Sequence, residues 1–194
     1  MNPWPIAAFV VMVLAWVAFV IVFATQKKAP SSPDKKRDRV SIFGIALQGS
    51  SYAIVWIIRR PWFTAMFPSN KAFEIGLAVL TMVLAVASVW FCGAAVRTLG
   101  KQWSLAARVL EGHNLVTEGP YSVVRNPIYT GMFGMLLATG LAVSHWIGLV
   151  IAVVVFAIGT YIRVRSEEKL LREMFGAEFE NYARRVPAVV PFLI

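Results

Sequence analysis

Long apolar segments constrain the fold of this chain more than any other feature. A helix needs about 20 mostly apolar residues to cross the roughly 30 Å hydrocarbon core of a bilayer. Five segments of about this length lie at Trp4–Thr25, Ser41–Ile58, Ala72–Val96, Pro127–Val143 and Trp146–Ile162. Charged residues make up only 15% of the 194 residues, against about 25% in soluble domains. The sequence predicts an all-α integral membrane protein with about five transmembrane helices.

The basic residues indicate how these helices are oriented. Sixteen of the 19 Lys and Arg residues lie in segments 26–40, 97–126 and 163–194, and three lie in segment 59–71. Because connections rich in Lys and Arg face the cytoplasm, we expect the N-terminus outside and the C-terminus inside. The first span is expected to be retained, since it lacks the basic region and the small-residue cleavage site of a signal peptide.

The composition disfavours several kinds of partner. The net charge of +9 would suggest nucleic acid for a soluble protein, but here the basic run Lys27–Arg39 acts as a topology signal that attracts anionic lipid headgroups weakly. Two histidines without HExxH spacing predict no metal site. The single cysteine, Cys92, excludes a disulfide framework and is expected to be a small packing residue. We expect the lipid bilayer as a partner, and neither nucleic acid nor a metal.

The chain is expected to form one membrane domain. Residues 1–71 are a two-helix part with a basic loop, and residues 72–194 are a core of three spans, a connecting loop and a C-terminal amphipathic helix. The longest polar pieces, Arg97–Asn126 and the tail after Arg163, have about thirty residues each and contain no GxGxxG or P-loop motif. A cofactor would therefore need a cytoplasmic pocket formed by the loop before the fourth helix and the C-terminal helical tail.

The loop before the fourth apolar segment is HNLVTEGPYSVVRNPIY, from His113 to Tyr129. Gly119-Pro120 indicates a tight turn, and Asn126 followed by Pro127 is an N-cap residue with proline at the first helical position. The amides of the first turn and the helix dipole would favour an anionic group such as a ligand carboxylate. On this feature alone, a simple cap of a membrane helix is an equally good interpretation.

Two ionisable residues follow the fifth apolar segment. Arg163 and Glu167 are four residues apart and hence on one helix face. A simple salt bridge is one interpretation, but Arg before Glu is the poorer order for such a pair, and ionisable residues next to a membrane span are functional candidates. Farther along, an apolar face predicts an amphipathic helix on the membrane surface or capping the site. Its residues are Leu170, Leu171, Met174, Phe175 and Phe179.

Several ordered motifs occupy the C-terminal half of the chain. They are His113-Asn114-Leu115-Val116-Thr117 with Gly119-Pro120-Tyr121, Val124-Arg125-Asn126-Pro127-Ile128-Tyr129-Thr130-Gly131, Arg163 with Glu167 and Glu168, and Phe175-Gly176 with Tyr182, Val186-Pro187 and Pro191. This pattern resembles the isoprenylcysteine carboxyl methyltransferases. The family usually has His where this chain has Asn126, and Asn is an equally good N-cap. The first two apolar segments carry no such signature.

The resemblance implies an integral membrane enzyme that uses S-adenosylmethionine, releases S-adenosylhomocysteine and methylates the carboxylate of a prenylated C-terminal cysteine. By matching motif, the catalytic residues would be Arg163, which orients the substrate carboxylate, and Glu167, which balances the positive groups of the cofactor. The carboxylate of the cofactor would lie at the start of the fourth helix. The implied cofactor contacts are His113, Asn114, Leu115, Val116, Tyr121, Asn126, Pro127, Ile128, Tyr129 and Glu167.

Other functions stay open at this point. Phospholipid and small-amine N-methyltransferases share this C-terminal architecture, although a neutral amine acceptor would favour a base or a carboxylate in place of Arg163. A sterol-type reductase that uses NADPH is a more distant likeness, and it would need more basic groups for the second phosphate. A non-catalytic scaffold or a transporter subunit is a further alternative. A transporter would favour ionisable residues near the bilayer midplane, and no charge lies in the middle of a span.

Overall fold

The fold consists of helices joined by short connections. The computed structural model describes residues 3–25, 36–37, 40–67, 70–100, 108–109 and 114–191. The long helices are α1 (Pro3–Ala24), α2 (Val40–Ile57), α3 (Lys71–Leu99), α4 (Pro127–Val143) and α5 (Trp146–Phe175). The short elements are the strands β1 (Lys36–Arg37) and β2 (Arg108–Val109), the 3-10 helix η2 (Gly119–Ser122) and helix α6 (Ala177–Ala183). The all-α prediction is confirmed, with one pair of two-residue strands added.

The five predicted spans correspond to the five long helices. Four of them, α1, α2, α3 and α5, are long and apolar enough to cross a membrane, and α4 is a shorter apolar helix of 17 residues. About 17 residues is the lower limit for a span. The structure therefore supports four to five spans. Helix α4 has the bounds predicted from the sequence, Pro127–Val143.

Helix α5 differs from the prediction because it does not end with the apolar segment at Ile162. It continues to Phe175 as one helix of 30 residues, which is about 45 Å long at 1.5 Å per residue. The added residues are mostly good helix formers such as Arg, Glu, Lys and Leu. The helix ends at Gly176, whose φ of 50° is a conformation that favours glycine. The predicted amphipathic helix is thus divided between the end of α5 and the short helix α6.

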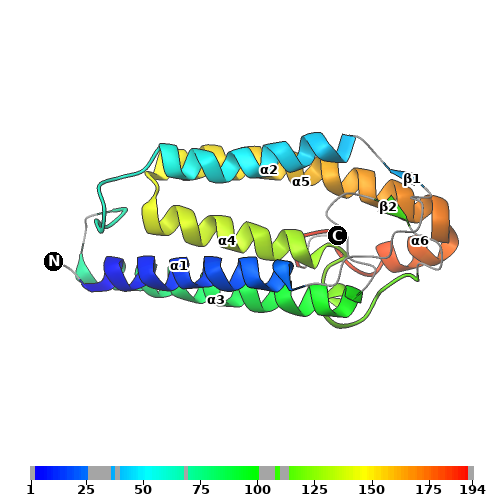
Figure 1. Cartoon of the computed structure of the whole chain (residues 1–194), viewed down its shortest axis with the longest axis horizontal. Coiled ribbons are helices and arrows are strands. Elements are labelled where there is room, and N and C mark those ends of the chain that lie inside the picture. Colours follow the sequence, from blue (N-terminus) through cyan, green and yellow to red (C-terminus); the bar gives the residue numbers. More distant parts are fainter. Residues whose placement is uncertain are drawn as a thin grey trace.

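The helices form two pairs with α4 between them (Figure 1). Helix α2 packs along α5, and α1 packs along α3, while α4 contacts α3 and α5. The largest core cluster lies between these elements and contains Met12, Val55, Leu136, Val143, Ala152 and Phe156. The indole of Trp16 on α1 donates a hydrogen bond to Thr139 Oγ1 on α4 over 3.0 Å. This arrangement brings the start of α4 and the polar end of α5 to the same end of the bundle.

Glycines allow close contacts between the packed helices. A Cβ at Gly159 on α5 would lie 2.9 Å from the carbonyl oxygen of Gly44 on α2. A Cβ at Gly131 on α4 would collide with the sulfur of Cys92 on α3. Small residues at helix contacts are typical of membrane bundles, because they let the backbones approach closely. Cys92 is buried, as expected for a small packing residue.

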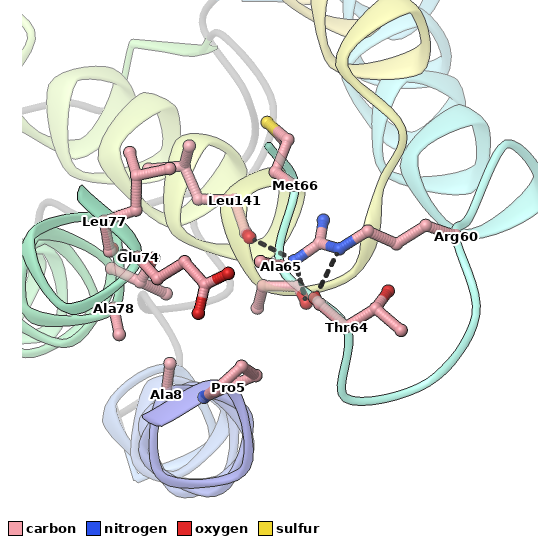
Figure 2. Close-up of a pocket in the computed structure, with 12 residues that line it drawn as sticks. Pro5, Ala8, Arg60, Thr64, Ala65, Met66, Glu74, Leu77, Ala78 and Leu141 are labelled. Carbon is pink, nitrogen blue, oxygen red and sulfur yellow. Dashed lines mark hydrogen bonds between the residues drawn. The ribbon is translucent and has the colours of Figure 1, made fainter. Parts of the chain in front are cut away.

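An arginine closes the other end of the bundle, where α4 terminates. The Arg60 guanidinium donates hydrogen bonds to the carbonyl oxygens of Leu141, Ala142 and Thr64 over 2.7 to 2.8 Å (Figure 2). Glu74 of α3 lines the same pocket. Burial lowers the pKa of Arg60 to about 10, so the side chain remains a cation at neutral pH. Arg60 thereby satisfies carbonyls that the end of α4 leaves without helical partners.

The basic connecting segments meet at the end of the bundle that carries α6. Strand β1 pairs antiparallel with β2, with Lys36 opposite Val109 and Arg37 opposite Arg108. Strand β2 contacts α5, and both strands lie at the end of the bundle where α6 is found (Figure 1). The described parts of the three segments rich in Lys and Arg therefore lie at one end of the bundle, as the alternating arrangement of spans requires. Which side of the membrane this end faces stays a prediction.

We expect single cysteines introduced at Glu118 and Arg185 to be labelled only from the cytoplasm, and one at His145 only from outside. All three positions are exposed. Glu118 precedes η2 and Arg185 follows α6 at one end of the bundle, whereas His145 lies between α4 and α5 at the other end. The expectation follows from the distribution of Lys and Arg. The measurement is labelling of intact cells by a membrane-impermeant maleimide, with and without permeabilisation. The native Cys92 is buried and serves as the unlabelled control. Labelling of Glu118→Cys and His145→Cys from one side would contradict the proposed topology.

Candidate functional site

The predicted pair Arg163 and Glu167 lies at the centre of a cluster contributed by three helices. Arg163 is only 4% exposed, and its Nη2 lies 3.2 Å from Glu167 Oε1. The hydroxyl of Tyr129, at the start of α4, donates a hydrogen bond to the same carboxylate oxygen. The Tyr129 ring also packs against the guanidinium, with 4.9 Å between Cζ and the ring centroid. The pair is therefore more than a surface salt bridge along one helix.

Gln48 on α2 is a member of this cluster that sequence reasoning missed. Its Oε1 accepts a hydrogen bond from Arg163 Nη1 over 3.4 Å, and its Nε2 donates to Thr160 Oγ1 over 2.9 Å. Gln48 is 2% exposed. The available signal was a glutamine within a long apolar segment, because polar side chains inside membrane helices commonly form hydrogen bonds to neighbouring helices.

The residue before α4 does not act as predicted. Asn126 occupies the N-cap position, and Pro127 is the first helical residue, but the Asn126 side chain makes no capping hydrogen bond. Its Nδ2 donates to the carbonyl of Ala188 over 3.0 Å, and its backbone N–H donates to the same oxygen over 2.9 Å. The side chain is turned toward the C-terminal tail because that tail lies alongside the start of α4. Asn126 therefore joins two segments rather than capping a helix.

The C-terminal tail is bound along the loop before α4. The backbone N–H of Arg125 donates to the carbonyl of Pro187 over 2.8 Å. Thr130 Oγ1 donates to the carbonyl of Val189 over 2.6 Å. The Tyr182 hydroxyl of α6 donates to the carbonyl of Tyr121 in η2 over 2.6 Å. These contacts unite the two polar pieces that the sequence predicted to act together.

Both tyrosines of this contact are protonated at neutral pH, as a free tyrosine with a pKa of about 10 also is, and burial raises the pKa of each further. Burial, and after it the charge of Glu167, raises the pKa of Tyr121 well above its ordinary value. Burial also raises the pKa of Tyr182 to about 12, against the opposing effect of Arg125. Tyr182 therefore keeps the proton that it donates to the carbonyl oxygen of Tyr121 well into the alkaline range.

Glu168 has a different role from its neighbour Glu167. Its Oε1 lies 2.9 Å from Arg125 Nη2, and its Oε2 lies 3.2 Å from Arg172 Nη2. Arg125 also donates to the carbonyls of Ala183 and Val186. Consecutive residues of a helix point in directions about 100° apart, which separates the partners of the two glutamates. Glu168 joins the loop, α5 and the tail, whereas Glu167 belongs to the Arg163 cluster.

The other predicted cofactor residues differ in how deeply they are buried. Tyr121 and Pro127 are buried, Leu115, Val116 and Ile128 are half-buried, and Asn114 is exposed. His113 lies outside the described residues. Tyr129 contacts Glu167 directly, whereas the backbone carbonyl of Tyr121 accepts a hydrogen bond from Tyr182 of α6. Within the part of the chain that the structure describes, no group of three His, Cys, Asp or Glu residues could hold a metal ion.

Comparisons with known proteins identify similar chains. The family described as phospholipid methyltransferase matches residues 71–178. A protein-S-isoprenylcysteine O-methyltransferase of Saccharomyces cerevisiae is 33% identical over 135 residues, which are 66% of this chain and 56% of the yeast protein. The protein-S-isoprenylcysteine O-methyltransferase B of Arabidopsis thaliana is 34% identical over 101 residues, 51% of each chain.

A third relative, which is named as a metal-resistance protein, has about the same sequence identity to this chain. The nickel-cobalt-cadmium resistance protein NccN of Alcaligenes xylosoxydans xylosoxydans is 34% identical over 110 residues, 56% of this chain and 51% of that protein. The matched region thus spans about half the length of these three relatives. The family match begins at residue 71, so it includes Tyr129, Arg163 and Glu167 but not α1 or α2.

Proposed function

Because this chain belongs to the phospholipid methyltransferase family, we propose that it transfers a methyl group from S-adenosylmethionine to the carboxylate of a lipophilic acceptor. We further propose that the acceptor is a C-terminal prenylated cysteine, which becomes the methyl ester. The observation that carries this proposal is the buried Arg163 guanidinium, which contacts Glu167 and Tyr129 next to the apolar part of α5. The names of the yeast and plant relatives support the choice of acceptor.

The residues of the cluster fit the proposed cofactor. S-adenosylmethionine carries an ammonium and a sulfonium, and when bound it supplies an electrophilic methyl group. The Glu167 side chain is 26% exposed, so its carboxylate is reachable by a cationic group. Tyr129 and Arg163 hold one carboxylate oxygen and thereby fix its position. The polar loop before α4 would hold the remaining groups, with Tyr121, Asn126, Pro127, Ile128 and His113 to Val116 as the proposed contacts.

Arg163 would orient the acceptor carboxylate. A guanidinium can donate two parallel hydrogen bonds to a carboxylate, which sets the direction of both oxygens. Free carboxylates are ionised at neutral pH, so no base is needed to activate this nucleophile. Methyl transfer from a cation to an anion removes opposite charges, which a site shielded from water favours. Arg163 and Tyr129 are 4% and 5% exposed, in keeping with such a site.

The direct test is methyl transfer by the purified protein. The protein is incubated with labelled S-adenosylmethionine and, in separate reactions, a prenylcysteine, an aminophospholipid and a sterol. We expect label in the prenylcysteine, as a base-labile methyl ester. The family's description and the accessible Glu167 carboxylate favour an amine acceptor as the second candidate, and label in the aminophospholipid alone would establish it. Binding of NADPH in place of S-adenosylhomocysteine would indicate a reductase.

Glu167→Gln is expected to weaken binding of S-adenosylhomocysteine by about 1 to 3 kcal/mol, the scale of one charge-assisted hydrogen bond. Glutamine has nearly the same shape and can still accept hydrogen bonds from Tyr129 and Arg163, so the change removes mainly the charge. The measurement is calorimetric titration of the detergent-solubilised protein. Glu178→Gln, which alters an exposed residue of α6, is the control and should bind normally. Equal affinities for the two variants would contradict a cofactor contact at Glu167.

A further inference from the structure

We infer that Gln48 is a positioning residue for Arg163, and that its neutral amide adapts the site to an anionic acceptor. This inference rests on the proposed function, because it concerns how Arg163 meets the acceptor carboxylate. It is carried by the contacts between α2 and α5. Gln48 lies outside residues 71–178, the part of the chain that matches the family.

Helix α2 is shaped to receive the Arg163 side chain. A Cβ at Gly44 would lie 2.5 Å from Arg163 Cγ, so any larger residue at position 44 would displace the arginine. Gly44 and Gln48 are four residues apart, hence on the same face of α2. The aliphatic part of Arg163 therefore crosses α2 at Gly44, and its guanidinium reaches Gln48 one turn farther along the helix.

Thr160 determines which way the Gln48 amide points. The Gln48 Nε2 donates to Thr160 Oγ1 over 2.9 Å, which leaves Oε1 directed at Arg163 Nη1, 3.4 Å away. A guanidinium has only donors, so the opposite amide orientation would place two donors against each other. All three side chains are at least nine-tenths buried, with exposed fractions of 2% for Gln48, 6% for Thr160 and 4% for Arg163. The amide is therefore held in the orientation that accepts from Arg163.

The absence of charge on Gln48 matters for the acceptor. Glu167 already places one carboxylate 3.2 Å from the Arg163 guanidinium. A second carboxylate at position 48 would make the cluster net negative, and it would repel an acceptor carboxylate in a buried site where charges are poorly screened. The carbonyl of glutamine holds Nη1 without adding charge. Gln48 thus fixes the guanidinium and preserves its attraction for an anion.

The experiment compares Gln48→Glu, Gln48→Met and Thr160→Val with wild-type protein. For each, KM and kcat are measured with a prenylcysteine and with S-adenosylmethionine, and binding is measured for the prenylcysteine acid and for its uncharged carboxamide. Ser51→Ala is the matched control. Ser51 is a buried polar residue on the same helix, and its hydroxyl donates to the backbone carbonyl of Gln48 over 2.6 Å. Melting curves of all variants identify any that fail to fold.

We expect Gln48→Glu to raise the acceptor KM about tenfold or more, a factor equivalent to about 1.4 kcal/mol. The acid should bind more weakly by the same factor, while the carboxamide should bind normally. Gln48→Met and Thr160→Val should raise the acceptor KM by smaller factors, because they free the guanidinium without adding charge. The KM for S-adenosylmethionine should change little in any of them, and Ser51→Ala should behave as wild type.

Three results would overturn the inference, and they can be told apart. If wild-type protein methylates the prenylcysteine but folded Gln48→Glu and Gln48→Met keep the wild-type acceptor KM, then Gln48 does not position Arg163 and the proposed function stands. If Gln48→Glu weakens the acid and the carboxamide equally, its effect is structural and the inference fails. If wild-type protein transfers no methyl group to the prenylcysteine, then the proposed function fails and the inference fails with it.

Discussion

Arg163→Ala is expected to reduce kcat/KM for methyl transfer to a prenylcysteine by about 100-fold or more, the scale associated with a misplaced reacting group. The substitution removes the only guanidinium of the cluster formed by Gln48, Tyr129, Arg163 and Glu167. Binding of S-adenosylhomocysteine should persist, because Tyr129 still donates to Glu167 and the Glu167 carboxylate loses a competing cation. The measurement pairs steady-state kinetics with calorimetric titration of the cofactor product.

Arg163→Lys provides the control for charge. Lysine keeps the positive charge but lacks the planar pair of donors, so we expect it to restore only a small part of the activity. Melting curves test whether the loss comes from unfolding, since Arg163 also packs over Gly44. Activity near wild type in a folded Arg163→Ala variant would rule out the proposed mechanism. If Arg163 and Glu167 formed only an isolated surface ion pair, Arg163→Ala should have nearly wild-type activity, because such a pair contributes only about 0 to 1 kcal/mol.

Glu168→Gln is expected to loosen the C-terminal tail from the loop before α4. Glu168 is 7% exposed and pairs with Arg125, which is 12% exposed. Removing one partner of a buried ion pair costs about 3 to 5 kcal/mol. We expect the lower end of that range, because Arg125 retains the carbonyls of Ala183 and Val186 as acceptors.

Amide hydrogen exchange gives a local measurement of this effect. The N–H groups of Arg125 and Asn126 donate to the carbonyls of Pro187 and Ala188, so they should be protected while the tail is bound. A loss of about 3 kcal/mol would speed their exchange by roughly 100-fold. Glu178→Gln, on the exposed face of α6, should leave this exchange unchanged. Unchanged protection in Glu168→Gln would show that the backbone contacts hold the tail without the ion pair.

The sequence by itself determined the features that depend on solvent and on local chain geometry. The positions of the five long apolar helices followed from the thickness of a bilayer, although α5 extends beyond its apolar segment to Phe175. The start of α4 followed from Asn126-Pro127. The proximity of Arg163 and Glu167 followed from the helical repeat. Each of these features depends on one short segment alone, through its contact with lipid or its own helical geometry, so the positions of other segments were not needed to predict it.

Only the tertiary structure decided which partners from other segments the polar side chains have. Gln48 reaches Arg163 across 115 positions of the chain, and Arg125 reaches Glu168 across 43. Asn126 has the residue type and position of an N-cap, yet it donates to Ala188 because the tail lies beside it. A buried polar group must find a partner wherever packing brings one within reach. That reach is set by how α2, α4, α5 and the tail pack, and periodicity within any one segment carries no information about it.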